Sequence, residues 1–337
     1  MARQVSGRTV DSARGQTAAT STSAAGSLAR RLQGVMIPTP TPFREHQVAA
    51  SFLQDNLSRW SRFEGITGFV VLGSTGESPL LAENERDALI AASRDAIGPE
   101  RALLVGVPAQ ATVLAIQQSE RAAALGADGV LVLSPHYFSR AFADPAVQLM
   151  HYLTVADASP LPVIIYQFPQ NTGITLDVDT VAALAEHDNV AGIKDSSGTL
   201  SLLAQMCALN CPAFSFMVGA AAGLLPSLSI GSAGGILALA AIAPYELTAI
   251  YRLARENDWE GAASVWRKLA PLDRIVHAQH GIGGLKVALD LLGYYGGAVR
   301  SPLKMPPEPA RDAIARALGE AELRTAPSVR GKLGTRS

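Results

Sequence analysis

The feature that most constrains this chain is one repeated pattern, in which a short apolar run is followed by a turn and an amphipathic stretch of helical periodicity. Eight such runs lie between about residues 34 and 240: GVMIPT (34–39), GFVVLG (68–73), ALLVGV (102–107), GVLVLS (129–134), PVIIYQ (162–167), VAGIK (190–194), FSFMVG (214–219) and GGILALA (234–240). Runs this short, and apolar without alternation, are typical of strands buried on both faces of a parallel sheet. Eight βα units over about 210 residues predict a (β/α)8 barrel.

The turn after the first apolar run and the segment after the last one distinguish between related folds. A doubly wound open sheet also alternates strands with helices, but its first turn carries a glycine-rich phosphate fingerprint. Here the stretch GVMIPTPTPF places prolines where those glycines would stand. From about residue 243 only helical patterns follow, such as APYELTAIYRLARE and GGLKVALDLLGYYGG. We therefore expect an α/β fold, a (β/α)8 TIM barrel with an appended C-terminal helical domain.

These patterns divide the chain into an arm (1–31), the barrel (32–242), a helical extension (243–325) and a basic tail (326–337). The arm is rich in Ser, Thr, Ala and Arg, contains one acid and has no apolar pattern, which indicates disorder. The same composition is typical of an organellar transit peptide. We expect a cytoplasmic protein, or one of the mitochondrial matrix if the arm is such a peptide.

The composition argues against several classes of function. A formal net charge of −1 leaves no basic footprint for a nucleic-acid partner. No apolar run of the sequence reaches the roughly 18 residues of a membrane span. No group of histidines and carboxylates has the spacing of a metal site, and Ser196 and Ser197 have no nearby histidine for a catalytic triad. Cys207 and Cys211 are typical of buried small hydrophobes in a reduced compartment.

One lysine stands where a barrel concentrates its chemistry. Lys194 ends the sixth apolar run; no lysine precedes it, and the other four stand at position 268 or later. Active sites of such barrels lie at the carboxyl ends of the strands. Burial there disfavours a charged ammonium, and a neutral amine is a nucleophile suited to carbonyl groups. The alternative is a lysine at the barrel rim that pairs with Asp195.

Two further strand ends carry polar groups. The loop GSTGES (73–78) is built of small residues, so its amides and the hydroxyls of Ser74 and Thr75 suit a carboxylate or a phosphate. A turn that caps the following helix explains the same residues. Tyr166 ends the fifth run, where it is either a core residue with a partner for its hydroxyl or an acid/base group at the barrel mouth.

Together these motifs resemble the dihydrodipicolinate synthase / N-acetylneuraminate lyase family of class I pyruvate aldolases. The matching elements are the GSTGE loop, the Y-x-x-P-x-x-T-G motif at 166–173, and a G-I-K strand whose lysine follows the tyrosine by 28 residues. The resemblance covers about residues 32 to 310. Within the family, the stretches GFVVLGSTGESPLL, VADASPLPVIIYQFPQNTG, GIKDSSG and GIGGLKVALDLLGYYGGAVRSPL look most similar to 4-hydroxy-2-oxoglutarate aldolase.

Three positions bear on that placement within the family. The synthase has an arginine, for the carboxylate of its second substrate, where this chain has Asn171. The asparagine agrees with the NTG of the aldolase. Thr75 stands where the aldolase tends to have asparagine, and Gln167-Phe168 is not its usual pair after the tyrosine. Both departures concern the aldehyde partner more than the pyruvate half.

The resemblance implies a metal-independent, cofactor-free carbon–carbon lyase that cleaves 4-hydroxy-2-oxoglutarate reversibly to pyruvate and glyoxylate. The alternatives are a 2-keto-3-deoxy sugar acid aldolase or dehydratase and a dihydrodipicolinate synthase-like enzyme, both using the same imine. A rival of another class is a non-catalytic barrel that binds a 2-oxo acid. The family also implies a homo-oligomer, a tetramer built as a dimer of dimers.

The resemblance assigns roles to individual residues of this chain. Lys194 would form the imine, Tyr166 would transfer protons, and Tyr137 would reach in from a neighbouring subunit to pass protons to Tyr166. For Tyr137 the alternative is packing at a subunit interface, and for Asn171 and Ser196 it is a turn or cap role. The implied substrate-binding residues are Ser74, Thr75, Asn171, Ser196 and Ile236.

Overall fold

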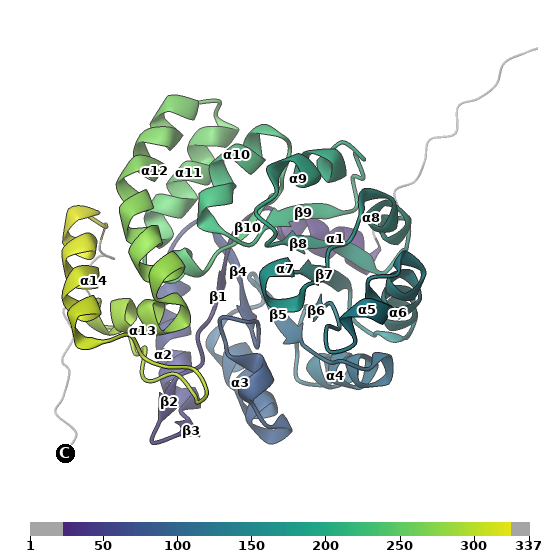
Figure 1. The fold of residues 1–337 in the computed structure, drawn as a ribbon, viewed down its shortest axis with the longest axis horizontal. Coiled ribbons are helices and arrows are strands. Elements are labelled where there is room, and N and C mark those ends of the chain that lie inside the picture. The colour runs from purple at the N-terminus through teal and green to yellow at the C-terminus, as the bar shows by residue number, and fades with distance from the viewer. Residues whose placement is uncertain (1–22, 325–337) are drawn as a thin grey trace, which may run out of the picture.

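The computed structural model describes residues 23–324 and contains the predicted barrel (Figure 1). Eight parallel strands close on one another in the order β1-β10-β9-β8-β7-β6-β5-β4. Each strand coincides with one of the eight apolar runs, so the predicted fold class is confirmed. The barrel strands are β1 (Gly34–Pro38), β4 (Ile66–Val71), β5 (Ala102–Val107), β6 (Gly129–Leu133), β7 (Val163–Gln167), β8 (Val190–Asp195), β9 (Ser215–Val218) and β10 (Gly234–Ile236).

A ring of helices surrounds the strands, and the hydrophobic core lies mostly between the two layers. Local signals set the helix ends. Asp144 and Asp177 accept hydrogen bonds from the first-turn amides of the helices that follow them, and Gly126 has the positive φ of a C-cap glycine. The ring consists of α2 (Ala50–Trp60), α3 (Glu83–Ala96), α4 (Thr112–Ala124), α6 (Pro145–Ala158), α8 (Val178–Ala185), α9 (Leu200–Cys207), α10 (Leu224–Ser229) and α11 (Pro244–Arg255).

The amino-terminal mouth of the barrel is covered by a helix that the sequence analysis did not expect. Residues Ala24–Arg31 form α1, which begins at Ser23, whose hydroxyl accepts from the amide of Gly26. Leu28 and Leu32 are buried among the inward-facing side chains of the strands, a burial that contributes about 1.5–3 kcal/mol for each. The predicted disordered arm is therefore wrong for residues 24–31. Residues 1–22, with the transit-peptide alternative, and the tail 326–337 lie outside the described residues.

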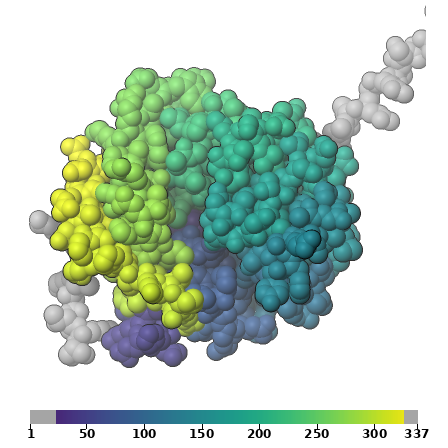
Figure 2. Space-filling model, viewed as in Figure 1, coloured from purple at the N-terminus to yellow at the C-terminus, as the bar shows by residue number. Residues whose placement is uncertain are grey.

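The remaining helices follow the barrel as predicted and occupy one side of the molecule, green to yellow in Figures 1 and 2. They are α12 (Trp259–Asp273), which continues into a π-helical turn (Arg274–Gln279), α13 (Gly281–Leu291) and α14 (Glu308–Glu320). Helix α11 packs against β1 and α10, in the place of the eighth barrel helix. We therefore propose that the helical extension begins after α11, not at residue 243.

The outline of the other connections completes the fold. A two-stranded antiparallel ribbon, β2 (Phe43–Arg44) and β3 (Gln47–Val48), follows β1. Two short helices, α5 (Ser139–Phe142) and α7 (Pro169–Thr172), follow β6 and β7. Figure 2 shows this face of the molecule hollowed between its green and teal parts, over the barrel strands.

Across residues 23–324, no helix is both long enough and apolar enough to cross a membrane.

Candidate active site at the carboxyl ends of the strands

Lys194 and Tyr166 lie side by side inside the barrel. They occupy paired positions on the neighbouring strands β8 and β7, so their side chains point to the same face. Both are buried, with exposed fractions of 5% and 3%. The Nζ atom of Lys194 lies 4.2 Å from the centroid of the Tyr166 ring. The barrel thus brings together an amine and a phenol that stand 28 positions apart in the sequence.

The alternative of a rim lysine paired with Asp195 is wrong. The Asp195 carboxylate accepts hydrogen bonds from Gln167 Nε2 (2.8 Å) and from the amide and hydroxyl of Ser197 (both 2.9 Å). Lys194 and Asp195 are successive strand residues, so their side chains point to opposite faces. Among the ion pairs within residues 23–324, none involves Lys194. The amine is therefore not committed to a carboxylate.

The loop 73–78 presents hydrogen-bond donors beside the phenol. Ser74 Oγ lies 3.3 Å from the hydroxyl of Tyr166. The amides of Gly76, Glu77 and Ser78 donate back to carbonyls within the loop. By contrast, the amides of Ser74 and Thr75 donate to no acceptor in the described part of the chain. Two free amides and two half-buried hydroxyls at a barrel mouth suit an anion such as a carboxylate.

Ile236 and Ser196 lie near this pair, and their role in substrate binding stays a prediction. Ile236 is fully buried among the inward-facing side chains that include Tyr166. Ser196 directly follows β8, and its amide donates to the carbonyl of Gln167 at 3.0 Å. Gly219 was not singled out, yet a Cβ atom there would lie 2.9 Å from Lys194 Cε and 1.8 Å from Ser196 Oγ. The missing side chain of Gly219 is what leaves room for both.

Phe168 is a second residue whose place the sequence did not show. Its ring lies 6.0 Å from the Tyr166 ring, with 26° between the two planes. The side chain is half-buried and packs against the inward-facing cluster of the barrel. It forms an apolar wall next to the phenol.

Tyr137 and Asn171 are not brought to Lys194 within one chain. Tyr137 is 79% exposed and packs edge-to-face on Phe138, itself 75% exposed. Asn171 is exposed in α7. A role for Tyr137 therefore requires a second copy of the chain, and both assignments stay predictions.

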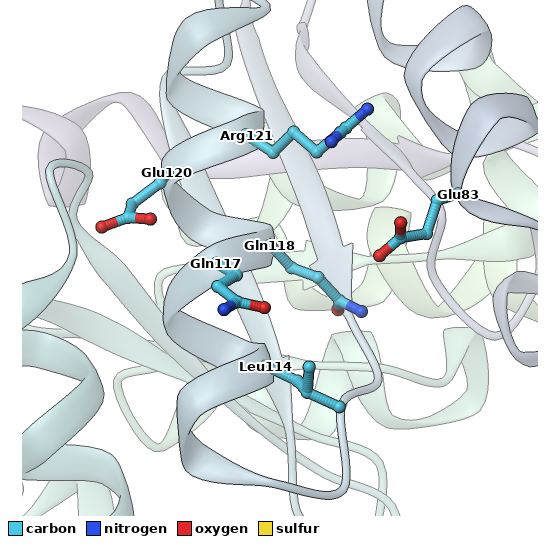
Figure 3. A pocket seen from close by; sticks show the side chains of 6 residues that line it. All are labelled: Glu83, Leu114, Gln117, Gln118, Glu120 and Arg121. Carbon is cyan, nitrogen blue, oxygen red and sulfur yellow. The ribbon is translucent and has the colours of Figure 1, made fainter.

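The outer helical layer carries a separate hollow of about 380 Å³ between α3 and α4. Its lining is mostly polar: Glu83, Leu114, Gln117, Gln118, Glu120 and Arg121. Figure 3 shows Gln118 and Arg121 pointing from α4 toward Glu83 of α3. Arg121 binds Asp87 with two donor nitrogens, so its charge is already paired. Neither Lys194 nor Tyr166 lines this hollow.

Comparisons with known proteins identify the family to which the chain is similar. The sequence model of the dihydrodipicolinate synthetase family matches residues 31–321. The chain is 36% identical to an uncharacterized DapA-like lyase of Halobacterium salinarum, over 81% of this chain and 88% of that protein. It is 30% identical to a 4-hydroxy-tetrahydrodipicolinate synthase of Syntrophus aciditrophicus, over 85% and 97%.

The fold is also similar to that of a chloride-inhibited dihydrodipicolinate synthase from Acinetobacter baumannii solved with pyruvate. The two share 28% identity with a TM-score of 0.81, and the match covers 87% of this chain and 100% of the other.

Proposed function

Since the chain belongs to the dihydrodipicolinate synthetase family of lyases, we propose that it is a class I aldolase that forms a Schiff base between Lys194 and a 2-oxo acid. The preferred substrate is 4-hydroxy-2-oxoglutarate, cleaved to pyruvate and glyoxylate. One observation carries the proposal: Lys194 is buried without a carboxylate partner, with its amine over the ring of Tyr166.

The first half of the reaction builds an electron sink. The neutral amine of Lys194 attacks the C2 ketone and forms a carbinolamine. Tyr166 donates a proton to the C2 hydroxyl, which leaves as water, so that a protonated imine and a tyrosinate remain. The cationic imine accepts the electron pair of the C3–C4 bond, a role that needs no metal.

The second half moves one proton at a time through Tyr166. The tyrosinate takes the proton of the C4 hydroxyl while the C3–C4 bond breaks, which releases glyoxylate and leaves an enamine. Tyr166 then protonates C3 of the enamine. Water attacks the resulting imine, Tyr166 accepts a proton again, and hydrolysis frees pyruvate and the Lys194 amine.

The loop 73–78 serves the carboxylate of the 2-oxo acid. The free amides of Ser74 and Thr75, with their hydroxyls, would bind the C1 carboxylate and hold the ketone against Lys194. Ile236 would contact C3 from the barrel interior. That a structural relative was solved with pyruvate supports this half of the proposal.

The distal half of the substrate decides between the family's reactions. Phe168 presents an apolar ring beside Tyr166. This phenylalanine ring offers no hydrogen bond to a chain of sugar hydroxyls. Asn171 and Ser196 would meet the second carboxylate. The apolar ring of Phe168 favours a short aldehyde such as glyoxylate over a sugar aldehyde. The similarity to proteins described as 4-hydroxy-tetrahydrodipicolinate synthases supports the synthase as the second candidate.

Assembly would complete the site. Tyr137 and Phe138 form an exposed aromatic pair, which a second copy of the chain would cover in a homo-oligomer. The proposed homo-oligomer is a tetramer. There Tyr137 would pass protons to Tyr166 of its neighbour.

Borohydride trapping tests the imine. Incubation with pyruvate and borohydride should add one reduced pyruvyl group to Lys194, located by peptide mass spectrometry, and the Lys194→Arg variant should add none. No added mass on the wild-type chain would refute the proposal. A panel of aldehydes offered with pyruvate then tests the substrate. Glyoxylate should give the highest kcat/KM. A higher kcat/KM with a sugar aldehyde or with aspartate semialdehyde would make that aldehyde the substrate in place of glyoxylate.

A further inference from the structure

A second lysine is buried beneath the loop 73–78. Lys286, on α13, is fully buried. Its Nζ donates to Glu77 Oε1 at 2.6 Å, to the carbonyl of Thr41 at 2.8 Å and to that of Ala298 at 2.7 Å. An ammonium has three donors, so all of them are used. Burial lowers the pKa of Lys286 and the carboxylate of Glu77 opposes that shift.

Glu77 is held equally completely. Its side chain is fully buried, and its second oxygen accepts from the amide of Arg300 at 2.7 Å. The backbone of Glu77 has φ +57°, a left-handed conformation that costs a residue with a Cβ atom about 1–2 kcal/mol. Such a conformation persists where the surroundings impose it. Here the surroundings are α13 and the segment at residues 298–300, far along the chain.

The pair acts on the part of the loop that faces the barrel. Glu77 donates its amide to the carbonyl of Ser74 at 3.0 Å, and Thr41 Oγ1 donates to the carbonyl of Gly76 at 2.6 Å. Lys286 therefore holds both Glu77 and the Thr41 segment that lies under the same loop. A shift of Glu77 would turn the peptide planes on either side of Ser74 and Thr75.

A gain in stability does not account for this arrangement well. Removing two charges from water costs free energy that their attraction often fails to recover, and apolar replacements of a buried pair are frequently neutral or stabilising. The pair does fix directions, because every donor and acceptor has one partner. It also joins the helical extension to the barrel mouth.

We propose that Glu77 and Lys286 are positioning residues that aim the amides of Ser74 and Thr75 at the substrate carboxylate. This inference rests on the proposed function, because the proposed function identifies the bound group as the C1 carboxylate of a 2-oxo acid. The helical extension then helps to hold the carboxylate-binding loop in place. Loss of the Glu77–Lys286 pair is expected to weaken binding of the carboxylate more than it slows formation of the imine.

The test replaces both charges together, because a single replacement would leave one charge buried alone. The double variant Glu77→Gln/Lys286→Met is compared with Glu322→Gln/Lys268→Met, which removes an exposed ion pair of the same helical region. Thermal melting establishes that each is folded. Glu77→Asp keeps both charges and shortens only the reach, so it decides the question if the double variant does not fold.

Two measurements follow on each folded variant. Hydrogen–deuterium exchange without any ligand should rise about tenfold at the hydrogen-bonded amides of residues 76–78 when the loop loses its anchor. The pyruvate concentration for half-maximal borohydride trapping should rise about tenfold, the effect of one misaligned charge-assisted hydrogen bond, while the trapping rate at saturation changes less than about twofold. The control pair should change neither quantity.

A folded double or Glu77→Asp variant with unchanged loop exchange would overturn the inference. So would a variant whose saturated trapping rate falls while its half-saturation stays constant. If wild-type chain is not trapped at all, the proposed function fails, and the exchange measurement still decides whether the pair positions the loop.

Discussion

Gly219→Ala tests whether the place of the Lys194 amine controls the chemistry. The new methyl would lie 2.9 Å from Lys194 Cε and 1.8 Å from Ser196 Oγ. Carbon atoms in contact prefer about 3.5–4.0 Å, so the lysine end must move by roughly 0.6–1.1 Å. Overpacking of this kind costs about 1–3 kcal/mol of stability. A displacement near 1 Å at a reacting group lowers the rate by about a hundredfold.

The assay is the rate of borohydride trapping at saturating pyruvate, with thermal melting as the measure of folding. Gly319→Ala is the matched control, because nothing lies within 4 Å of a Cβ atom at that position of α14. Replacing Ser196 by Gly in the same chain removes the Ser196 clash and leaves the Lys194 contact. That double variant should regain stability and should trap no faster than Gly219→Ala, with Ser196→Gly alone as its reference. A folded Gly219→Ala variant that traps pyruvate at the wild-type rate would refute the reasoning.

Three further outcomes are expected. Tyr166→Phe should lower kcat by about 10²–10⁴-fold, the contribution of a positioned proton donor, with melting unchanged; activity within a factor of three would remove the tyrosine from the mechanism. Ser74→Ala loses a hydroxyl 3.3 Å from the phenol and should raise KM about tenfold, measured against Ser229→Ala, an exposed hydroxyl control. Burial lowers the pKa of His151 to about 4 from 6.5. This folded-state pKa lies below the unfolded value, so the unfolded chain binds more protons, and stability is lost as pH falls from about 6.5 to 4. Urea unfolding should show a loss of about 2 kcal/mol between pH 7 and pH 5 that His151→Gln lacks, and equal losses in both chains would contradict this.

The barrel was predictable because its strands are buried on both faces and therefore read as unbroken apolar runs. Lys194 and Tyr166 were predictable as neighbours because each ends a run, and strand ends of a parallel barrel meet at one mouth. Helix α1 was not predictable, since its Ala-, Ser- and Arg-rich sequence gives little apolar signal. The helix is stabilised by the burial of Leu28 and Leu32 in the open end of the barrel, a contact that its own sequence does not reveal.

The misses in the site share one physical cause, which is contact between residues distant in the chain. Glu77 and Lys286 stand 209 positions apart, and either alone looks like an ordinary charged residue of a loop or helix. Gly219 matters through the space it leaves for Lys194, which no local pattern records. The exposure of Tyr137 in one chain shows why its assignment still depends on a second copy.

The two buried lysines differ in their hydrogen bonds, and the difference supports the proposed role of Lys194 as the nucleophile. Lys286 has three acceptors at 2.6–2.8 Å, one of them a carboxylate, so its lone pair is not available for attack. Lys194 donates no hydrogen bond within residues 23–324 and lies over an aromatic face. Arginine could not replace either residue: its guanidinium stays protonated and cannot form an imine, and its planar fork does not match three acceptors around one nitrogen. A chain that otherwise relies on arginine before residue 268 therefore has its first lysine at the barrel position where the proposed imine requires a primary amine.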